Sequence, residues 1–382
     1  MKMSGDISRL RVLSVFGTRP EAIKMCPLVK ELERCSIDSM VCLSGQHRRM
    51  LDQVIDVFGI KVDYDLNIMK PNQQLYTITA DVLTKMQDVL SDATPDIVLV
   101  HGDTSTSFAA ALAAFYMQIP VGHVEAGLRT FNKYSPYPEE MNRCLTDRIS
   151  ELLFAPTTHN RENLIREGVT ENVFVTGNTV IDAFKTTVRT GYEYNMPEIT
   201  DIVRQSEGKR LLLMTAHRRE NLGTPLRNIC NAAKRLIEDN EDAVLIYPVH
   251  LNPAVQETAR SILGNRERVY LTDPIDVVDM HNLMAKSFLV LTDSGGLQEE
   301  APSFGAPVLV LRTETERPEA VEAGTVKVVG VEETRIYNEA TILLRDRAAY
   351  MAMQNAINPY GDGHASERIV RLLMDWRMRS LS

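Results

Sequence analysis

The chain lacks the long apolar runs and the cysteine patterns that mark membrane-spanning and disulfide-bonded proteins. No apolar run approaches the roughly 18 residues that a membrane-spanning helix needs. The N-terminus has only a short apolar run before a glycine turn, which favours a first strand over a signal peptide. The cysteines are odd in number, widely spaced and without a CxxC pair: Cys26, Cys35, Cys42, Cys144 and Cys230. We therefore expect free thiols in a reducing cytoplasm, and neither disulfides nor zinc.

Positive charge is also scarce. The 42 lysines and arginines are outnumbered by 51 aspartates and glutamates, and the net charge of −9 argues against a nucleic-acid-binding or anionic-membrane surface. The GxGxxG fingerprint of dinucleotide-binding folds is absent, and so are solenoid repeats and low-complexity segments. Apolar residues fill 44% of the 382 positions. That content is enough for two cores, and the length predicts two domains.

The centre of the chain has the pattern of a β-α-β unit. Two short apolar runs, Ile97–Val100 and Val121–Val124, flank an alanine-rich helix expected near residues 108–117. Both strands end in a carboxylate, Asp103 after the first and Glu125 after the second. The carboxyl ends of strands in an open parallel sheet are where ligands bind. Asp103 has an alternative role as the cap of the helix, whereas Glu125 has no cap to supply.

An anion site is predicted where the first strand, Leu10–Phe16, meets the following helix. Pro20 suits the first turn of that helix, and a strand-glycine-helix junction offers free backbone N–H groups to an anion. Arg19 at this junction adds a bidentate phosphate donor. The alternative is that Arg19 is an ordinary surface charge.

A loop over residues 130–138 ends where Glu139 and Glu140 open a helix. Either glutamate can complement the positive N-terminal end of the helix dipole. Because the loop directly follows Glu125, we expect at least one of the two to reach the same site.

The second half of the chain repeats the α/β pattern after a polar segment, residues 191–206, that we interpret as part of an interdomain crossing. The domains predicted are residues 1–190 and 191–365, followed by a C-terminal helix over 366–382. In the second domain Ser294, Gly295 and Gly296 carry no bulky side chain, so a diphosphate can approach the backbone at a helix N-terminus. Glu299, about one turn later, is placed to accept hydrogen bonds from ribose hydroxyls.

Eight motifs in register give the chain a strong resemblance to one family. They are Gly17–Lys24, Gln46–Arg48, His101–Thr104, Glu125–Thr130, Pro138–Arg143, His217–Asn221, Asp293–Glu300 and Thr315–Glu319. Together they resemble the bacterial, non-hydrolysing UDP-N-acetylglucosamine 2-epimerases, over about Leu10 to Trp376.

The resemblance implies an α/β architecture like that of the B-type glycosyltransferases, with two Rossmann-like domains facing a cleft and the C-terminal helix folding back on the first domain. It implies reversible conversion of UDP-GlcNAc into UDP-ManNAc, without NAD or any other cofactor and without metal, in the service of surface polysaccharides. It also implies a cytoplasmic homodimer, with UDP-GlcNAc as an effector in some members. No nucleic acid or membrane partner is expected.

The resemblance further assigns roles to residues. The catalytic candidates are Asp103, Glu125, Glu139 and His217. The substrate-binding candidates are Arg19, Lys24, Arg218, Ser294, Gly295, Gly296, Glu299 and Arg317. The candidates for an effector pocket are Gln46, His47 and His250, with Arg218 beside them.

The chemistry of C2 inversion explains why several acids are needed. The C2 hydrogen is not next to a carbonyl, so expelling UDP from C1 as the proton leaves gives a planar glycal, and re-adding UDP and a proton gives the epimer. Removal and return on opposite faces call for two acid/base groups, and the leaving diphosphate needs further help. Which carboxylate removes the proton and which returns it stays open.

Three other functions are compatible with such residues. A hydrolysing epimerase releases UDP and N-acetylmannosamine from the same intermediate. A glycosyltransferase of the same fold needs an acceptor groove, for which the sequence has no signature. A non-catalytic nucleotide-sugar sensor has no need for three acids in one site. The close match of the motifs favours the non-hydrolysing epimerase.

Overall fold

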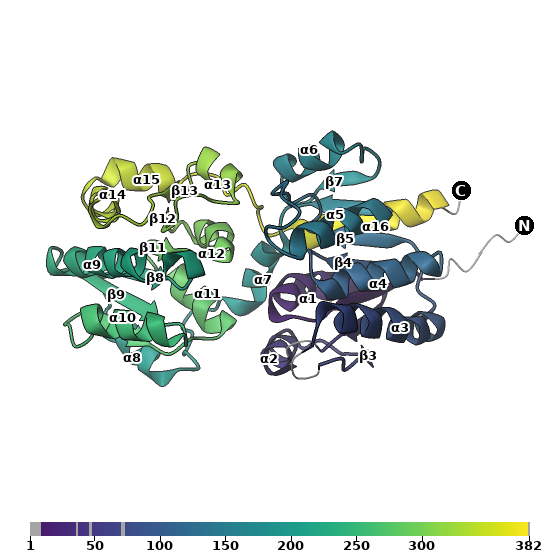
Figure 1. Cartoon of the computed structure of the whole chain (residues 1–382), viewed down its shortest axis with the longest axis horizontal. Coiled ribbons are helices and arrows are strands. Elements are labelled where there is room, and N and C mark those ends of the chain that lie inside the picture. Colours follow the sequence, from purple (N-terminus) through teal and green to yellow (C-terminus); the bar gives the residue numbers. More distant parts are fainter. Residues whose placement is uncertain (1–8, 36, 46–47, 70–72, 381–382) are drawn as a thin grey trace, which may run out of the picture. The chain divides into compact units, whose positions relative to one another are not determined.

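The computed structural model describes residues 9–35, 37–45, 48–69 and 73–380, and it divides the chain into two compact units (Figure 1). The first unit holds the described residues up to Thr186 together with those from Tyr360 onward, and the second holds Thr187–Pro359. Each unit contains one sheet with helices packed around it (Figure 1). Among the helices of the described ranges, none has the length and apolar character needed to cross a membrane.

The first unit is built on a parallel sheet with the strand order β3-β2-β1-β4-β5-β6-β7. Its strands are β1 (Arg11–Phe16), β2 (Asp38–Leu43), β3 (Tyr64–Asp65), β4 (Ile97–His101), β5 (Val121–Val124), β6 (Leu152–Ala155) and β7 (Val173–Val175). Its helices are α1 (Arg19–Arg34), α2 (Arg48–Phe58), α3 (Leu75–Ala93), α4 (Ser105–Tyr116), α5 (Glu139–Ile149), α6 (Thr158–Arg166), α7 (Thr179–Thr187) and α16 (Ala365–Ser380), the last of which packs on α1. The strand order reverses between β1 and β4, and open α/β sheets bind ligands at the carboxyl ends of strands beside such a switch point.

The second unit has a parallel sheet of the same kind, in the order β10-β9-β8-β11-β12-β13. Its strands are β8 (Arg210–Thr215), β9 (Ala243–Pro248), β10 (Val269–Thr272), β11 (Leu289–Thr292), β12 (Val308–Val310) and β13 (Val326–Val328). Its helices are α8 (Pro197–Gln205), α9 (Thr224–Glu238), α10 (Pro253–Leu263), α11 (Val277–Ala285), α12 (Gly295–Glu300), α13 (Pro318–Glu322), α14 (Glu333–Arg345) and α15 (Arg347–Gln354), with short 3₁₀ turns η1 (Arg219–Asn221) and η2 (Ala301–Phe304). The switch point here lies between β8 and β11. The predicted α/β class with two parallel sheets is confirmed.

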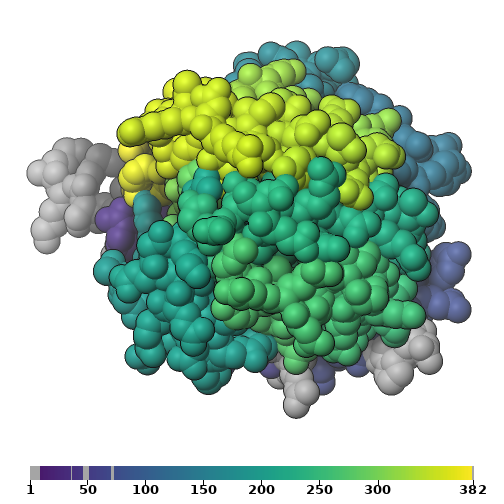
Figure 2. Space-filling view, turned by 90° about the vertical axis from the view of Figure 1, so that its left-hand side faces the viewer, coloured from purple at the N-terminus to yellow at the C-terminus, as the bar shows by residue number. Residues whose placement is uncertain are grey.

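The central strands of both sheets are buried on both faces, as their continuous apolar runs predict. All residues of β4 and β5 in the first unit are buried, and so are those of β9 and β11 in the second. In the second unit, α9 packs against both α10 and α14 over one face of the sheet. Figure 2 shows this side of the unit, with α14 and α15 in yellow-green beside the teal-green α9. Such rigid sheets hold the turns at their strand ends in fixed positions.

The helix after β4 starts earlier than expected, and its N-cap is not Asp103. α4 begins at Ser105, and its N-cap is Thr104, whose hydroxyl accepts the N–H of Ser107 at 3.1 Å. The alternative that Asp103 caps this helix is therefore wrong. The side chain of Asp103 is left for another purpose.

Two segments without a clear periodic pattern in the sequence contain regular structure. Tyr64 and Asp65 form β3, which adds an edge strand to β2. The polar segment over residues 191–206 contains the nine-residue α8, of which only Ile199 and Ile202 are buried. A helix with two buried apolar positions has too weak a periodicity to be seen in the sequence.

The junction between β1 and α1 is closed by the carboxylate of Glu21, which is buried. Its Oε2 accepts the N–H groups of Gly17 at 3.0 Å and Thr18 at 2.7 Å. Its Oε1 accepts the hydroxyls of Thr104 at 2.7 Å and Ser107 at 2.9 Å, which ties β1 to the start of α4. This is a capping box. Glu21 thus takes up two of the backbone N–H groups that this junction was expected to offer to an anion, those of Gly17 and Thr18.

We predict that Glu21→Gln destabilises the protein by about 3 kcal/mol, because an amide leaves donors facing donors in a buried site. Urea denaturation at pH 7 measures this. Glu33→Gln is the matched control and should cost less than about 0.5 kcal/mol, since among the described residues the Glu33 side chain makes only an exposed ion pair with Lys30. Equal midpoints for the two variants would contradict a central role for Glu21.

Candidate active site

Two carboxylates meet at the carboxyl edge of the first sheet. Asp103 follows β4 after the Gly102 turn, and Glu125 directly follows β5. Gly102 has φ +64°, and a Cβ placed on it would lie 3.8 Å from Oε1 of Glu125, so this carboxylate lies beside the turn that leads to Asp103. Glu125 itself has φ +67°, which is rare for a residue with a side chain and is typical of functional sites.

Cationic and polar groups surround Glu125. The ammonium of Lys24 forms an ion pair with its Oε2, the Nε2 of His101 lies 3.5 Å from the same oxygen, and the amide of Asn178 donates to it at 3.2 Å. Burial alone would raise the pKa of Glu125, but Lys24 and His101 outweigh it and hold that pKa well below its usual range. Glu125 is therefore ionised at neutral pH.

The pKa of Asp103 is shifted in the opposite direction. Burial raises the pKa of Asp103, and the negative charges of Glu125 and Glu139 raise it further, although the guanidinium of Arg143 opposes them. Nη2 of Arg143 lies 2.9 Å from Oδ2 of Asp103, and the amide of Asn142 donates to the Asp103 carbonyl at 2.9 Å. Two nearby carboxylates with pKa values shifted in opposite directions are typical of an acid/base pair.

The two glutamates that open α5 have different roles. The carboxylate of Glu140 is buried and accepts the N–H groups of Thr130 at 3.0 Å and Phe131 at 2.8 Å, so it holds the loop. The carboxylate of Glu139 makes no hydrogen bond or ion pair with another described residue, and its charge acts on Asp103. Of the two, Glu139 is the one left available for chemistry.

Arg19 and Lys24 lie on α1. Arg19 is the first residue of the helix, and within the described ranges its guanidinium has no ion-pair partner. Lys24 reaches Glu125 instead of standing free for a phosphate. Lys24 therefore acts on the acid, and Arg19 is the residue of the two that stays a candidate donor for an anion.

In the second unit, the buried carboxylate of Asp293 holds the turn that carries His217. Its Oδ2 accepts the N–H groups of His217 and Arg218, each at 2.8 Å, and the amide of Asn221 at 3.0 Å. The ring of His217 stacks on that of His250, with centroids 5.1 Å apart and an interplanar angle of 6°. Burial lowers the pKa of His217, and His250 and Arg218 add to this against the opposing charge of Asp293. His217 is therefore neutral at neutral pH.

Two guanidinium groups lie close to Gly295, the first residue of α12. A Cβ on Gly295 would lie 3.4 Å from Nη2 of Arg317 and 3.9 Å from Nη2 of Arg218, so two guanidinium groups face a backbone without a side chain. Gly296 and Ser294 flank it. Glu299 is buried, and its carboxylate accepts a hydrogen bond from Nε of Arg317. Arginine forks and open backbone together are suited to a phosphate.

Of the residues expected in an effector pocket, Gln46 and His47 lie outside the described residues. His250 stacks on His217 and so belongs to the same cluster as a catalytic candidate. The described part of the chain contains no cluster of three His, Cys, Asp or Glu side chains arranged to hold a metal ion.

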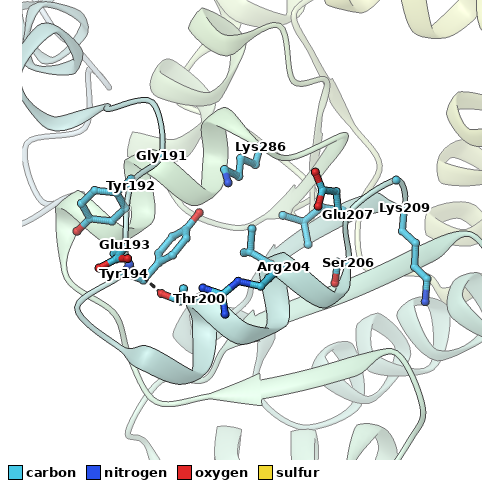
Figure 3. Close-up of a pocket in the computed structure, with 13 residues that line it drawn as sticks. Gly191, Tyr192, Glu193, Tyr194, Thr200, Arg204, Ser206, Glu207, Lys209 and Lys286 are labelled. Carbon is cyan, nitrogen blue, oxygen red and sulfur yellow. Dashed lines mark hydrogen bonds between the residues drawn. The ribbon is translucent and has the colours of Figure 1, made fainter.

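A separate cavity of about 430 Å³ lies in the second unit beside α8 (Figure 3). None of the predicted site residues lines it. The hydroxyl of Tyr194 is buried at this cavity without a hydrogen-bond partner among the residues described. The charged side chains in the lining are two acids and three bases, Glu193, Glu207, Arg204, Lys209 and Lys286, a mixture that favours no single class of ligand.

With both sets of residues described, comparison with known proteins identifies the family. The family model for UDP-N-acetylglucosamine 2-epimerases matches residues 30–374. The chain belongs to the UDP-N-acetylglucosamine 2-epimerase family. The UDP-N-acetylglucosamine 2-epimerase of Bacillus subtilis is 55% identical to it over 370 residues, which cover 96% of each chain.

Solved structures agree with this membership. The UDP-GlcNAc 2-epimerase from Neisseria meningitidis, bound to UDP-GlcNAc, is 49% identical with a TM-score of 0.84, covering 96% of this chain and 100% of that one. The S. aureus MnaA–UDP co-structure is 50% identical with a TM-score of 0.86, covering 96% of each chain. The glycotransferase of kitacinnamycin, 13% identical with a TM-score of 0.62 over 96% of this chain and 100% of that one, shares only the fold. The expected α/β fold, like that of the B-type glycosyltransferases, is confirmed for this member of the epimerase family.

Several residues around the acids were not singled out from the sequence. His101 and Asn178 contact Glu125, Arg143 contacts Asp103, and Asp293 holds the His217 turn. His101, Arg143 and Asp293 stand inside the motifs of the epimerase family, which is the signal that marks them. Asn178 follows β7 outside every motif, and only the fold brings it to Glu125.

The opposite pKa shifts predict opposite effects on stability. Asp103 has a raised pKa, so its charge opposes folding at neutral pH, and Asp103→Asn should leave the free energy of unfolding within about 1 kcal/mol of wild type or above it. Glu125 has a lowered pKa, so its charge stabilises the fold above its unfolded-state pKa. Glu125→Gln leaves the mostly buried Lys24 side chain without this carboxylate and should lower the free energy of unfolding by about 3 kcal/mol at pH 7.

Chemical denaturation of both variants at pH 7 and in acid tests this. The loss caused by Glu125→Gln should shrink as the pH falls through the folded-state pKa, because the wild type then loses the same contribution. Glu139→Gln is the control, with no ion pair to lose among the described residues. If Glu125→Gln were as stable as wild type and Asp103→Asn were destabilised, the charge of Asp103 and not that of Glu125 would be the one that stabilises the fold.

Proposed function

We propose that the protein is a non-hydrolysing epimerase, which interconverts UDP-GlcNAc and UDP-ManNAc by eliminating and re-adding UDP through a 2-acetamidoglucal. The observation that carries the proposal is the group of Asp103, Glu125 and Glu139, two of them with pKa values shifted in opposite directions. Membership of the epimerase family supports the substrate. The product then serves as a precursor of surface polysaccharides. The protein itself is proposed to act in the cytoplasm as a homodimer, with UDP-GlcNAc as a candidate effector.

The pKa directions suggest how the acids divide the work. Glu125, kept ionised by Lys24 and His101, is suited to remove the C2 proton. Asp103, with its raised pKa, is suited to hold a proton and deliver it to the other face of the glycal. In the reverse direction the two exchange roles. Glu139 adds to the burial and to the charge of Glu125 that raise the pKa of Asp103, and it offers a further carboxylate.

The leaving diphosphate needs cations and hydrogen-bond donors. We assign the phosphates to Arg218, Arg317 and the backbone at Gly295, with Arg19 as a further phosphate donor. His217, neutral because its pKa is lowered, is suited to donate a hydrogen bond to the leaving phosphate. Glu299, oriented by Arg317, is suited to accept the ribose hydroxyls.

Nucleotide binding and turnover should respond to different substitutions. Arg19→Ala and Glu299→Ala each lose a charge-assisted contact made before the reaction starts, so the Kd for UDP should rise about tenfold or more. Asp103→Asn, Glu125→Gln and Glu139→Gln should keep the Kd within about twofold and lose about 10²- to 10⁴-fold in turnover. Calorimetry with UDP and a coupled assay separate the two groups. If the carboxylate variants lose affinity for UDP and keep their turnover, the assignment of these three residues to catalysis is wrong.

Isotope exchange distinguishes elimination from the other routes. Purified protein incubated with UDP-GlcNAc alone in heavy water should give UDP-ManNAc with deuterium at C2, because the returning proton comes from a side chain that exchanges with solvent. The oxygen that bridges C1 and phosphorus should scramble with its non-bridging neighbours, since the free diphosphate rotates before recapture. His217→Asn should slow both exchanges together.

NMR of a single reaction mixture measures the deuterium uptake, the oxygen scrambling and the identity of the products. UDP with free N-acetylmannosamine as the main products would favour the hydrolysing reaction instead. Deuterium uptake without oxygen scrambling, together with bound NAD in the purified protein, would indicate oxidation and reduction and would exclude elimination.

A further inference from the structure

A buried histidine lies behind the catalytic edge of the first sheet. His123 belongs to β5, and its side chain is fully buried. Its Nδ1 lies 2.6 Å from Oδ1 of Asp147 on α5, and its Nε2 lies 2.8 Å from the carbonyl oxygen of Gly102. Gly102 immediately precedes Asp103, so the ring contacts the peptide that leads into a candidate acid without touching the acid itself.

The partners of His123 determine its protonation state. A carbonyl oxygen only accepts hydrogen bonds, so Nε2 must carry a proton. The other oxygen of Asp147 pairs with the buried guanidinium of Arg129, so Asp147 is an ionised acceptor and Nδ1 must carry a proton as well. With both ring nitrogens donating, His123 is an imidazolium cation.

The charges around this cation balance within the same unit. Oδ2 of Asp147 lies 2.7 Å from Nη2 of Arg129. Arg129 also binds Glu167 through Nε at 2.9 Å and Nη2 at 2.8 Å. His123, Arg129, Asp147 and Glu167 thus form one chain of alternating charges, which runs from Glu167 at the end of α6 to the Gly102 turn. A buried charge is tolerated when it is paired and hydrogen-bonded in this way.

The Gly102 turn needs such a contact because glycine rotates easily. Gly102 has φ +64°, and its N–H is held by the carbonyl of Val124 at 2.9 Å. Beyond it, the carbonyl of Asp103 is held by Asn142 and its carboxylate by Arg143. The bond from His123 is the one that fixes the orientation of the Gly102 carbonyl, and hence of the peptide plane that sets the direction of the Asp103 side chain.

We propose that His123 is a positioning residue for Asp103: a buried imidazolium, balanced by Asp147, that fixes the Gly102–Asp103 peptide so that the Asp103 carboxylate stays in register with Glu125. This rests on the proposed function, because it supposes that Asp103 acts on the C2 proton. A displacement of about 1 Å in a catalytic group costs about 10²-fold in rate.

Two amide substitutions separate the two contacts of the ring. The amide nitrogen of asparagine occupies a position like that of Nδ1, and the amide nitrogen of glutamine a position like that of Nε2. His123→Asn therefore keeps a donor for Asp147 and loses the Gly102 bond, whereas His123→Gln keeps the Gly102 bond. Both variants remove the same buried cation, so they serve as controls for each other in stability.

We expect His123→Asn to lower kcat for epimerisation about 10²-fold with KM within about twofold, and His123→Gln to stay within about tenfold of wild type. Denaturant midpoints measured in parallel should be similar for the two variants. Equal kcat values for two folded variants, or an effect on KM alone, would overturn the positioning role. Should either variant fail to fold, the ring measurement below still decides the proposal.

NMR of protein labelled with ¹⁵N-histidine provides that second measurement, with the His123 signals identified by their loss in a variant. Both ring nitrogens should carry protons at neutral pH. A neutral ring with one protonated nitrogen would overturn the proposal whatever the kinetics. A wild-type protein that shows the imidazolium but no epimerase activity would refute the proposed function, and a wild type that is active with a neutral ring would refute the buried imidazolium while leaving the proposed function intact.

Discussion

A buried carboxylate that binds two successive backbone N–H groups fixes the site turn in each unit. Glu21 closes the turn after β1 through the N–H groups of Gly17 and Thr18, and Asp293 closes the turn after β8 through those of His217 and Arg218. Glu21 comes from the helix that the turn introduces, whereas Asp293 comes from the neighbouring strand. The result is the same: two successive amides of each turn are already satisfied, so the anion binding that we propose relies on the side chains of arginine and on the open backbone at Gly295.

The acids at the edge of the first sheet show what this rigidity is used for. Glu125 lies in a left-handed conformation, and Asp103 has a raised pKa, so both are held in states that the isolated residues disfavour. Only a scaffold that is stable elsewhere can maintain them. The fully buried β4 and β5 supply that stability, and the turns at their ends carry the strain.

The sequence predicted the strands and the acids well, because each depends on a local pattern. A continuous apolar run marks a buried parallel strand, and a carboxylate directly after it must lie at the ligand-binding edge. Partners distant in sequence are not visible in this way: His123 and Asp147 are 24 residues apart, and Glu125 and Asn178 are 53 apart. The free amides expected after β1 illustrate the limit. An acid in the first turn of a helix has the same pattern whether it serves the helix dipole or, as Glu21 does, fills the anion site itself.

The nature of each partner separates the structural acids from those suited to chemistry. Glu21 and Glu140 accept backbone N–H groups, which cannot leave without unfolding the turn, and Asp147 is enclosed between two buried cations. Asp103 and Glu125 pair instead with the side chains of Arg143 and Lys24, and Glu139 has no such partner among the described residues. A carboxylate that must take up and release protons in a catalytic cycle needs contacts that can loosen and re-form. By that criterion Asp103, Glu125 and Glu139 are the acids suited to the proposed chemistry, and the other acids hold the turns around them.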